Sequence, residues 1–184
     1  MSAFVLEARM NIWHDIDPAR ISEQSFDAVV EIPRGGKQKY ELDKETGLLM
    51  LDRVLYTSTH YPANYGFIPL TLEEDGDPMD VLILSTEAFA PLSLIPCAPI
   101  GLIRMIDDHE RDDKIIAVAK GDPTYNGYRS IHELPAHVAD EISHFFSVYK
   151  QLEGKESVAE SVGDYEEALE VIRASIVRYS QEFK

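Results

Sequence analysis

The sequence predicts an α+β fold, mainly β, in which a small antiparallel sheet or barrel is covered by C-terminal helices. Two observations predict it. Alternating apolar and β-branched residues dominate the first two thirds of the chain, and apolar residues at helical spacing dominate the last third. We find no internal repeat and no linker in the 184 residues, so we expect a single domain over residues 1–184.

The strand-like segments are short and end at turn residues. Two of them, Tyr40–Leu42 and Leu48–Val54, are joined by a turn over Asp43–Gly47. The others are Phe26–Ile32, which ends at Pro33, and then Val81–Leu84, Ala98–Ile106 and Ile115–Ala119. Because these strands precede the helical region, the order favours an α+β fold.

Two helices are expected in the last third of the chain. After Pro135, apolar residues recur at helical spacing as far as Leu152, and Gly154 stands where a C-terminal cap is expected. Asp164 and Glu167 have the spacing of a capping box, which predicts the start of a second helix. Its apolar face is formed by Ala168, Val171, Ile172, Ile176 and Tyr179.

The net charge limits the function classes. The chain has 33 acidic and 17 basic side chains, and its formal net charge is −16. Such a field repels nucleic acid and anionic membranes, so we expect neither as a partner. Acidity of this kind can serve solubility alone, unless the acidic residues are clustered.

Cys97 is the only cysteine, so the chain forms no internal disulfide and no cysteine-rich zinc site. This usage fits the reducing cytosol. The segment Met1–Met10 resembles no signal peptide, and no apolar run reaches the roughly 20 residues that span a bilayer. We therefore expect a soluble cytoplasmic protein.

The acidic residues are clustered in two loops, Glu73–Asp80 and Asp107–Lys114, each beside a predicted strand. Carboxylates this close repel one another unless cations intervene, and hard ions such as Mg²⁺ prefer carboxylate and water oxygens. An EF-hand is excluded by its spacing. A solvated acidic turn is the alternative, but Gly76 and Pro78 favour a turn that directs Asp75, Asp77 and Asp80 to one point.

Basic and phenolic residues lie near these loops in the sequence. Lys39 and Glu41 share one face of a strand, and Arg53 closes the next strand. Residues 61–66 form an aromatic turn before the first acidic loop, and residues 149–150 (Tyr-Lys) lie near the end of the first helix. Each of these alone has a structural explanation, such as a core tyrosine or a helix-end lysine.

The motif Asp75-Gly76-Asp77-Pro78-Met79-Asp80-Val81 is similar to the signature D-[SGDN]-D-[PE]-[LIVMF]-D-[LIVMGAC] of the family I soluble inorganic pyrophosphatases. Further motifs occur in that family's order: Glu31-Ile32-Pro33, Lys39-Tyr40-Glu41, Asp52-Arg53, Tyr61-Pro62-Ala63-Asn64-Tyr65-Gly66, and Phe145-Phe146 through Tyr149-Lys150. The resemblance runs from about Trp13 to the last helix and is closest to the bacterial type.

The resemblance implies a five-stranded closed OB-like barrel with flanking C-terminal helices. It implies hydrolysis of inorganic pyrophosphate to phosphate by a magnesium-dependent diphosphatase, with Mn²⁺ or Zn²⁺ as possible substitutes. Asp77 is the implied general base. The implied metal ligands are Asp75, Asp80, Asp107, Asp112, Glu31 and Glu41. The implied phosphate-binding residues are Lys39, Arg53, Lys114, Tyr149 and Lys150, with Tyr65 on the side of the nucleophile.

This chemistry agrees with the composition. Mg²⁺ lowers the pKa of a bound water toward neutrality, and metal with Lys and Arg stabilises charge on the departing phosphate. An acidic protein can thus bind an acidic substrate if metal accompanies it. By analogy with the bacterial type, we expect a homohexamer.

Two positions depart from the family pattern. Asp108 stands where many members carry Glu, and the stretch 154–158 lacks the Trp of many bacterial members. A non-enzymatic OB-like module that binds cations or a partner remains an alternative, although it has no need of phosphate ligands. A serine or cysteine hydrolase is disfavoured, because the chain lacks a G-x-S-x-G motif and no histidine is placed near Cys97 by the sequence.

Overall fold

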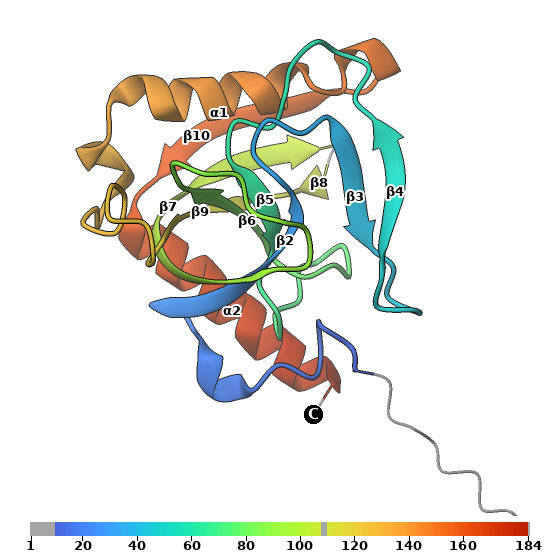
Figure 1. Ribbon diagram of the computed structural model, residues 1–184, viewed down its shortest axis with the longest axis vertical. Helices are drawn as coiled ribbons and strands as arrows, with labels where there is room; N and C mark the ends of the chain where they lie inside the picture. Colours follow the sequence, from blue (N-terminus) through green and yellow to red (C-terminus); the bar gives the residue numbers. More distant parts are fainter. Residues whose placement is uncertain (1–9, 108–109, 184) are drawn as a thin grey trace, which may run out of the picture.

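The computed structural model describes residues 10–107 and 110–183, and five of its strands form a closed ring (Figure 1). The ring runs through β2 (Ser25–Ile32), β5 (Asn64–Phe67), β6 (Asp80–Leu84), β9 (Lys114–Ala119) and β7 (Leu94–Asp107), and β7 pairs back to β2. The prediction of a mainly β fold with a five-stranded closed arrangement and C-terminal helices is confirmed. The predicted acidic residue Asp108 lies outside the described residues.

Both faces of the central strands are apolar, because both are covered. In β6, Leu82 and Leu84 pack in a core that includes Phe145 and Phe146. The alternate residues Val81 and Ile83 pack in a second core that includes helical residues from the C-terminus. Strands buried on both faces lose the polar alternation of a half-exposed sheet. β6 pairs in parallel with β9, so the first residues of the two strands lie at the same end of the ring.

The hairpin of β3 (Gln38–Leu42) and β4 (Leu49–Val54) forms a separate two-stranded sheet beside the ring (Figure 1). The predicted turn is confirmed: the Asp43 amide donates to the Leu48 carbonyl at 2.8 Å. Gly47 has a φ of 72°, a conformation that favours glycine. Much of the hairpin is exposed, including Leu51 and Val54.

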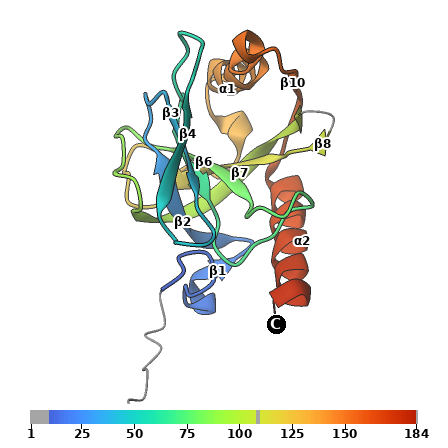
Figure 2. The same ribbon diagram turned by 90° about the vertical axis from the view of Figure 1, so that its right-hand side faces the viewer.

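Helix α1 (Ala136–Val148) and helix α2 (Tyr165–Phe183) flank the ring of strands (Figure 2). The predicted capping box is confirmed, since the Glu167 amide donates to Asp164 and the Asp164 amide donates to Glu167, both at 3.0 Å. α1 ends earlier than its apolar pattern predicts. A 3₁₀ turn, η3 (Gln151–Glu153), follows it, and Gly154 caps that turn with a φ of 71°.

One predicted feature is wrong, and one strand was not predicted. Residues 64–66, expected as part of the aromatic turn over 61–66, belong instead to β5 (Asn64–Phe67) in the ring. Gly66 permits this, because a Cβ there would lie 1.8 Å from the Val29 carbonyl oxygen of the neighbouring strand. The link between the helices forms β10 (Ser157–Gly163), which pairs with β7, so a strand lies between the two helices in the chain.

The remaining elements are small. They are η1 (Pro18–Arg20), β1 (Ile21–Ser22), β8 (Glu110–Arg111) and η2 (Ile131–Glu133). Within the described part of the chain, no helix is long and apolar enough to cross a membrane.

Candidate active site

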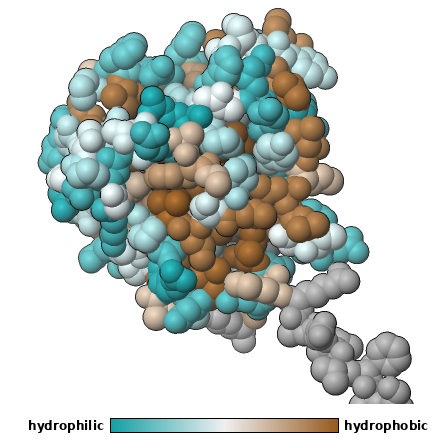
Figure 3. All heavy atoms as spheres, in the orientation of Figure 1, coloured by the Kyte–Doolittle hydropathy of each residue, from teal (hydrophilic) through white to brown (hydrophobic). Residues whose placement is uncertain are grey.

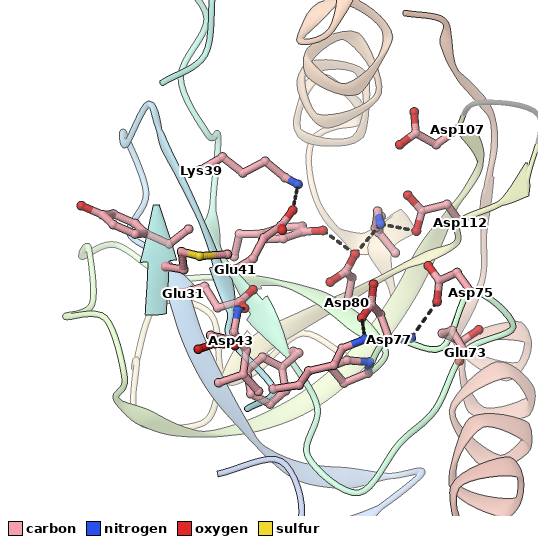
Figure 4. Close-up of a pocket in the computed structure, with 18 of the residues that line it drawn as sticks. Glu31, Lys39, Glu41, Asp43, Glu73, Asp75, Asp77, Asp80, Asp107 and Asp112 are labelled. Carbon is pink, nitrogen blue, oxygen red and sulfur yellow. Dashed lines mark hydrogen bonds and ion pairs between the residues drawn. The ribbon is translucent and has the colours of Figure 1, made fainter. Parts of the chain in front are cut away.

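The candidate site is a cleft of about 620 Å³ where β6 and β9 begin and β7 ends, beside the β3–β4 hairpin. It brings together the predicted residues Glu31, Lys39, Glu41, Tyr65, Asp75, Asp77, Asp80, Asp107, Asp112, Lys114, Tyr149 and Lys150. Arg53 is the predicted residue that does not line it. In Figure 4, the acids of β2 and β3 lie on one side of Asp80 and those of the two acidic loops lie on the other.

Asp80 is at the centre of the cleft because three ring strands meet there. It is the first residue of β6, Lys114 is the first residue of the adjacent β9, and Tyr65 lies on β5 on the other side. The Tyr65 hydroxyl donates to the Asp80 carboxylate at 2.5 Å. The Lys114 ammonium contacts the carboxylates of both Asp80 and Asp112. The strand pairing therefore gathers a phenol, an ammonium and two carboxylates from distant parts of the sequence.

The low exposure of this centre shifts its titrating groups. Burial raises the pKa of Asp80, and the neighbouring Lys114 acts in the opposite direction. Burial alone would lower the pKa of Lys114, but the carboxylates of Asp80 and Asp112 raise it above its ordinary range. Burial also raises the pKa of the Tyr65 phenol, with Asp80 adding to the shift. Lys114 is therefore a charged donor, and Tyr65 is a neutral one.

The first acidic loop is a closed turn that is joined to the hairpin. The Glu73 amide donates to the Asp77 carbonyl at 2.7 Å, and the Asp77 amide donates to the Asp75 carboxylate at 2.9 Å. Gly76 has a φ of 87°, which the turn requires and glycine permits. Lys44 of the hairpin turn donates to the Gly76 carbonyl at 3.0 Å and contacts the Asp77 carboxylate. The side chain of Asp77 is 57% exposed, so it can accept a proton from solvent in the cleft.

Glu31 faces this loop from β2 and is only 6% exposed. Its carboxylate accepts a hydrogen bond from the Leu42 amide at 2.8 Å. Burial, with a further contribution from the charge on Asp80, raises the pKa of Glu31 to about 8. An acid held mostly neutral at pH 7 in this way ionises readily when a cation approaches.

The hairpin carries the predicted pair Lys39 and Glu41, and their shared strand face is confirmed. The Lys39 ammonium contacts the Glu41 carboxylate and lies 3.5 Å from Asp52. Arg53 lies behind them, where its Nε donates to Glu153 at 2.9 Å and its Nη1 contacts Asp52. Its Nη2 is buried and has no hydrogen-bond partner among the described residues.

The end of α1 supplies the last predicted residues. The Tyr149 ring is 4% exposed and packs edge-on to Phe146, with ring centroids 5.5 Å apart. Lys150 follows the helix and contacts the carboxylate of Asp107 at the end of β7. The other oxygen of this carboxylate, Asp107 Oδ1, is buried without a hydrogen-bond partner in the described structure.

Similarity to known proteins identifies the family to which this cleft belongs. The family model described as inorganic pyrophosphatase matches residues 28–180. The chain belongs to the inorganic pyrophosphatase family. It is 48% identical over 171 residues to "Soluble inorganic pyrophosphatase 2" of Chlamydomonas reinhardtii, covering 93% of this chain and 89% of that protein. It is 51% identical over 167 residues to the soluble inorganic pyrophosphatase of Oryza sativa subsp. japonica, covering 91% and 78%.

Solved structures of inorganic pyrophosphatases have the same fold. The enzyme from Thermus thermophilus superposes with a TM-score of 0.85 at 39% identity, covering 93% of this chain and 99% of that one. The enzyme from Helicobacter pylori superposes with a TM-score of 0.83 at 42% identity, covering 86% and 95%. The resemblance inferred from the sequence motifs is therefore confirmed.

The donor chemistry of this pyrophosphatase cleft fits hard divalent cations. Among the described residues, no three acid, thiol or imidazole groups converge closely enough to hold a metal ion. Instead, the Lys114 ammonium lies between Asp80 and Asp112 and places positive charge between them. Asp107 Oδ1, which has no hydrogen-bond partner in the described structure, is a further carboxylate oxygen available to a cation. Carboxylate oxygens are the ligands that Mg²⁺ prefers.

Five charged cleft residues did not emerge from the sequence as site residues: Asp43, Lys44, Glu45, Glu73 and Asp113. Lys44 and Glu73 line the cleft, as does Asp113, whose carboxylate accepts from Arg104 at 3.2 Å and from the Met105 amide at 3.3 Å. Glu73 and Asp113 belong to the acidic loops, but nothing in their spacing separates them from exposed loop acids. Lys44 lies in the predicted turn Asp43–Gly47, where a charged side chain is usually at the surface.

Proposed function

We propose that the cleft hydrolyses inorganic pyrophosphate to two orthophosphates, as an inorganic diphosphatase. One observation carries the proposal: the acidic centre of Asp80 and Asp112, joined by the buried Lys114, shares a cleft with Lys39, Lys150 and Tyr149. An acidic centre alone would suit a cation. The basic and phenolic groups add the donors that phosphate oxygens need. Family membership supports the same activity, and the alternative of a non-enzymatic module is not favoured.

The proposed metal ligands are the cleft carboxylates. Asp75, Asp80, Asp107 and Asp112 would hold Mg²⁺ directly, while Glu31 and Glu41 would organise a further ion through water. Mn²⁺ or Zn²⁺ are possible substitutes. Bound metal supplies positive charge that lowers the pKa of the attacking water and neutralises the phosphate oxygens. Glu31 is buried and mostly neutral before a metal ion binds, so it does not repel the neighbouring carboxylate of Asp80.

Most of the proposed phosphate-binding residues have donors that carboxylates hold in this structure. When substrate binds, the Lys150 ammonium would leave Asp107 and contact a phosphate oxygen. The Lys39 ammonium would leave Glu41 in the same way. Arg53, on β4 of the hairpin, would donate from its unpaired Nη2 to a phosphate oxygen. Lys114, Tyr149 and Tyr65 complete the set. Because every one of these donors is charged or phenolic, each can stabilise the charge that develops on the leaving phosphate.

Asp77 is the proposed general base. Its carboxylate lines the cleft, and its side chain is 57% exposed, compared with 26% for Asp80. The Lys44 ammonium of the hairpin turn contacts this carboxylate. Asp77 would accept the proton of the attacking water as the new P–O bond forms and the bridging P–O bond breaks. General-base groups of this kind contribute about 10²–10⁴-fold to the rate.

The experiment is phosphate release from pyrophosphate with Mg²⁺ present. We expect turnover that is lost on chelation and restored by added Mg²⁺. No turnover with Mg²⁺, Mn²⁺ or Zn²⁺ would contradict the proposal. Calorimetry would then separate the rival: cation binding without pyrophosphate affinity is the result expected of a non-enzymatic module.

We also propose that one domain forms the subunit of a cytoplasmic homohexamer. The β3–β4 hairpin exposes several large apolar side chains, and Figure 3 shows apolar side chains gathered over one face of the molecule. The exposed hairpin residues are Leu48, Met50, Leu51, Val54 and Tyr56. Exposed apolar areas of this kind mark interaction surfaces. Light scattering should give six times the chain mass, and a monomer in solution would contradict the assembly.

A further inference from the structure

Helix α2 holds the first acidic loop, although it contributes no residue to the predicted site. Figure 2 shows the green loop that precedes β6 reaching α2, and Figure 4 places Glu73 beside that helix. The Leu72 amide donates to the Ser175 carbonyl at 3.1 Å. A carbonyl oxygen has two lone pairs, so it can accept this bond in addition to its bond within the helix.

Arg178, one turn further along α2, makes the other contacts. Its Nη1 donates to the Leu72 carbonyl and lies 3.5 Å from the Glu73 carboxylate. Its Nη2 lies 3.7 Å from the Glu74 carboxylate. One guanidinium therefore reaches a backbone carbonyl and two side chains of the loop. The planar guanidinium suits this task, because its donors point in several fixed directions at once.

The residue that Arg178 holds is also the residue that closes the turn. The Glu73 amide donates to the Asp77 carbonyl at 2.7 Å, and the Glu73 carbonyl accepts from the Gly76 amide at 3.2 Å. This turn also orients Asp75, whose carboxylate accepts a hydrogen bond from the Asp77 amide. A displacement of Glu73 would thus move the loop carboxylates relative to Asp80, which the ring of strands holds in place.

We propose that Arg178 is a positioning residue for the metal-binding turn and acts through Leu72 and Glu73. This inference rests on the proposed function. Arg178 does not line the cleft, so its effect passes through the loop backbone. Residues that orient metal ligands typically alter metal affinity by about 10–100-fold when removed. For a residue one step further from the metal, we expect about fivefold to tenfold.

The test compares Arg178→Met with Arg173→Met. Arg173 lies on the same helix, is exposed and pairs with Glu23 at 3.4 Å, so its loss removes the same charge without touching the loop. In R178M we expect Mn²⁺ affinity, measured by electron paramagnetic resonance without substrate, to fall about fivefold to tenfold. Amide exchange over residues 73–77 should accelerate. R173M should match the wild type in both measurements.

Kinetics give a further readout that a purely stabilising role would not move. The Mg²⁺ concentration for half-maximal hydrolysis should rise by the same factor as the Mn²⁺ dissociation constant, while kcat at saturating Mg²⁺ stays within about twofold. Folded R178M with wild-type Mn²⁺ affinity and wild-type exchange would overturn the proposal.

If R178M does not fold, Arg178→Lys decides. A single ammonium cannot reach Leu72 and both carboxylates together, so we expect an intermediate loss of Mn²⁺ affinity, about twofold to fourfold. Wild-type affinity in R178K would overturn the proposal. The proposed function and the proposed role of Arg178 are tested by different measurements. If the wild type does not hydrolyse pyrophosphate, the proposed function is contradicted. Mn²⁺ affinity and amide exchange still test the role of Arg178.

Discussion

The two sides of the cleft are built differently. One side, called the barrel side here, is formed by the closed ring of strands. There Asp80 and Lys114 begin strands that pair on both edges, and Leu82 and Ile116 on these strands are fully buried. On the hairpin side, Lys39 and Arg53 lie on two strands that pair only with each other in the described structure. Leu51, on the same hairpin, is 50% exposed.

The difference indicates how each side is held. A buried charge on the barrel side depends on its partner, because removing one member of a buried pair leaves the other uncompensated. The Lys39 ammonium on the hairpin is held by the more accessible carboxylates of Glu41 and Asp52, and such pairs stabilise little. Changes on the barrel side should therefore alter stability, while changes on the hairpin side should alter substrate binding.

The largest effect is expected at Asp77, which connects the two sides through its contact with Lys44. Asp77→Asn should lower kcat by about 10²–10⁴-fold, because the amide cannot accept the proton of the attacking water. Mg²⁺ binding by calorimetry should persist. Unchanged turnover would remove Asp77 from the role of base.

Lys114→Met should have the largest effect on stability. The ammonium contacts both Asp80 and Asp112, so its loss leaves two carboxylates facing each other in the cleft. Without divalent metal, we expect the free energy of unfolding in urea to fall by about 3–5 kcal/mol. Added Mg²⁺ should restore part of it. Equal stability of variant and wild type without metal would contradict a buried, mutually dependent centre.

Glu31 should make the stability of the metal-free protein pH-dependent. Its folded pKa of about 8 lies above the ordinary 4.5, so between these values the native state holds a proton that the unfolded state has lost. The stability contributed by neutral Glu31 is full below about pH 4.5 and is lost as pH rises through about 8.

The matched variant is Glu31→Gln, which cannot ionise. Urea unfolding from pH 5 to 9 should show the wild type losing about 4 kcal/mol relative to this variant, and Mg²⁺ should reduce the difference. Parallel pH profiles would mean that Glu31 is ionised in the folded protein.

The smallest effect on stability is expected at Arg53. Arg53→Met removes the unpaired Nη2 and the bonds to Asp52 and Glu153. We expect KM for pyrophosphate to rise about tenfold, because charge-assisted bonds to phosphate are strong. The free energy of unfolding should fall by about 1.5–3 kcal/mol, because the bond to the largely buried Glu153 is lost. A loss of stability as large as that of K114M would show that the hairpin is held as firmly as the barrel.

Sequence patterns found the residues of the cleft more completely than they found its architecture. The D-G-D-P-M-D-V motif and the ordered Lys, Arg and Tyr motifs indicated the cleft residues, because their local order is legible along the chain. The strands β5 and β10 were missed. β5 is only four residues long and contains Gly66, and β10 is a largely exposed strand in which polar residues break the alternation. The assigned roles of the cleft residues stay predictions.

The sequence by itself determined the element types with strong periodicity, the two acidic loops and the family. Only the tertiary structure decided which side chains meet. Tyr65, Asp80 and Lys114 converge because three strands pair edge to edge, and Arg178 reaches the acidic loop because α2 packs beside it. These contacts join residues far apart in the chain, and a local pattern carries no information about such distances.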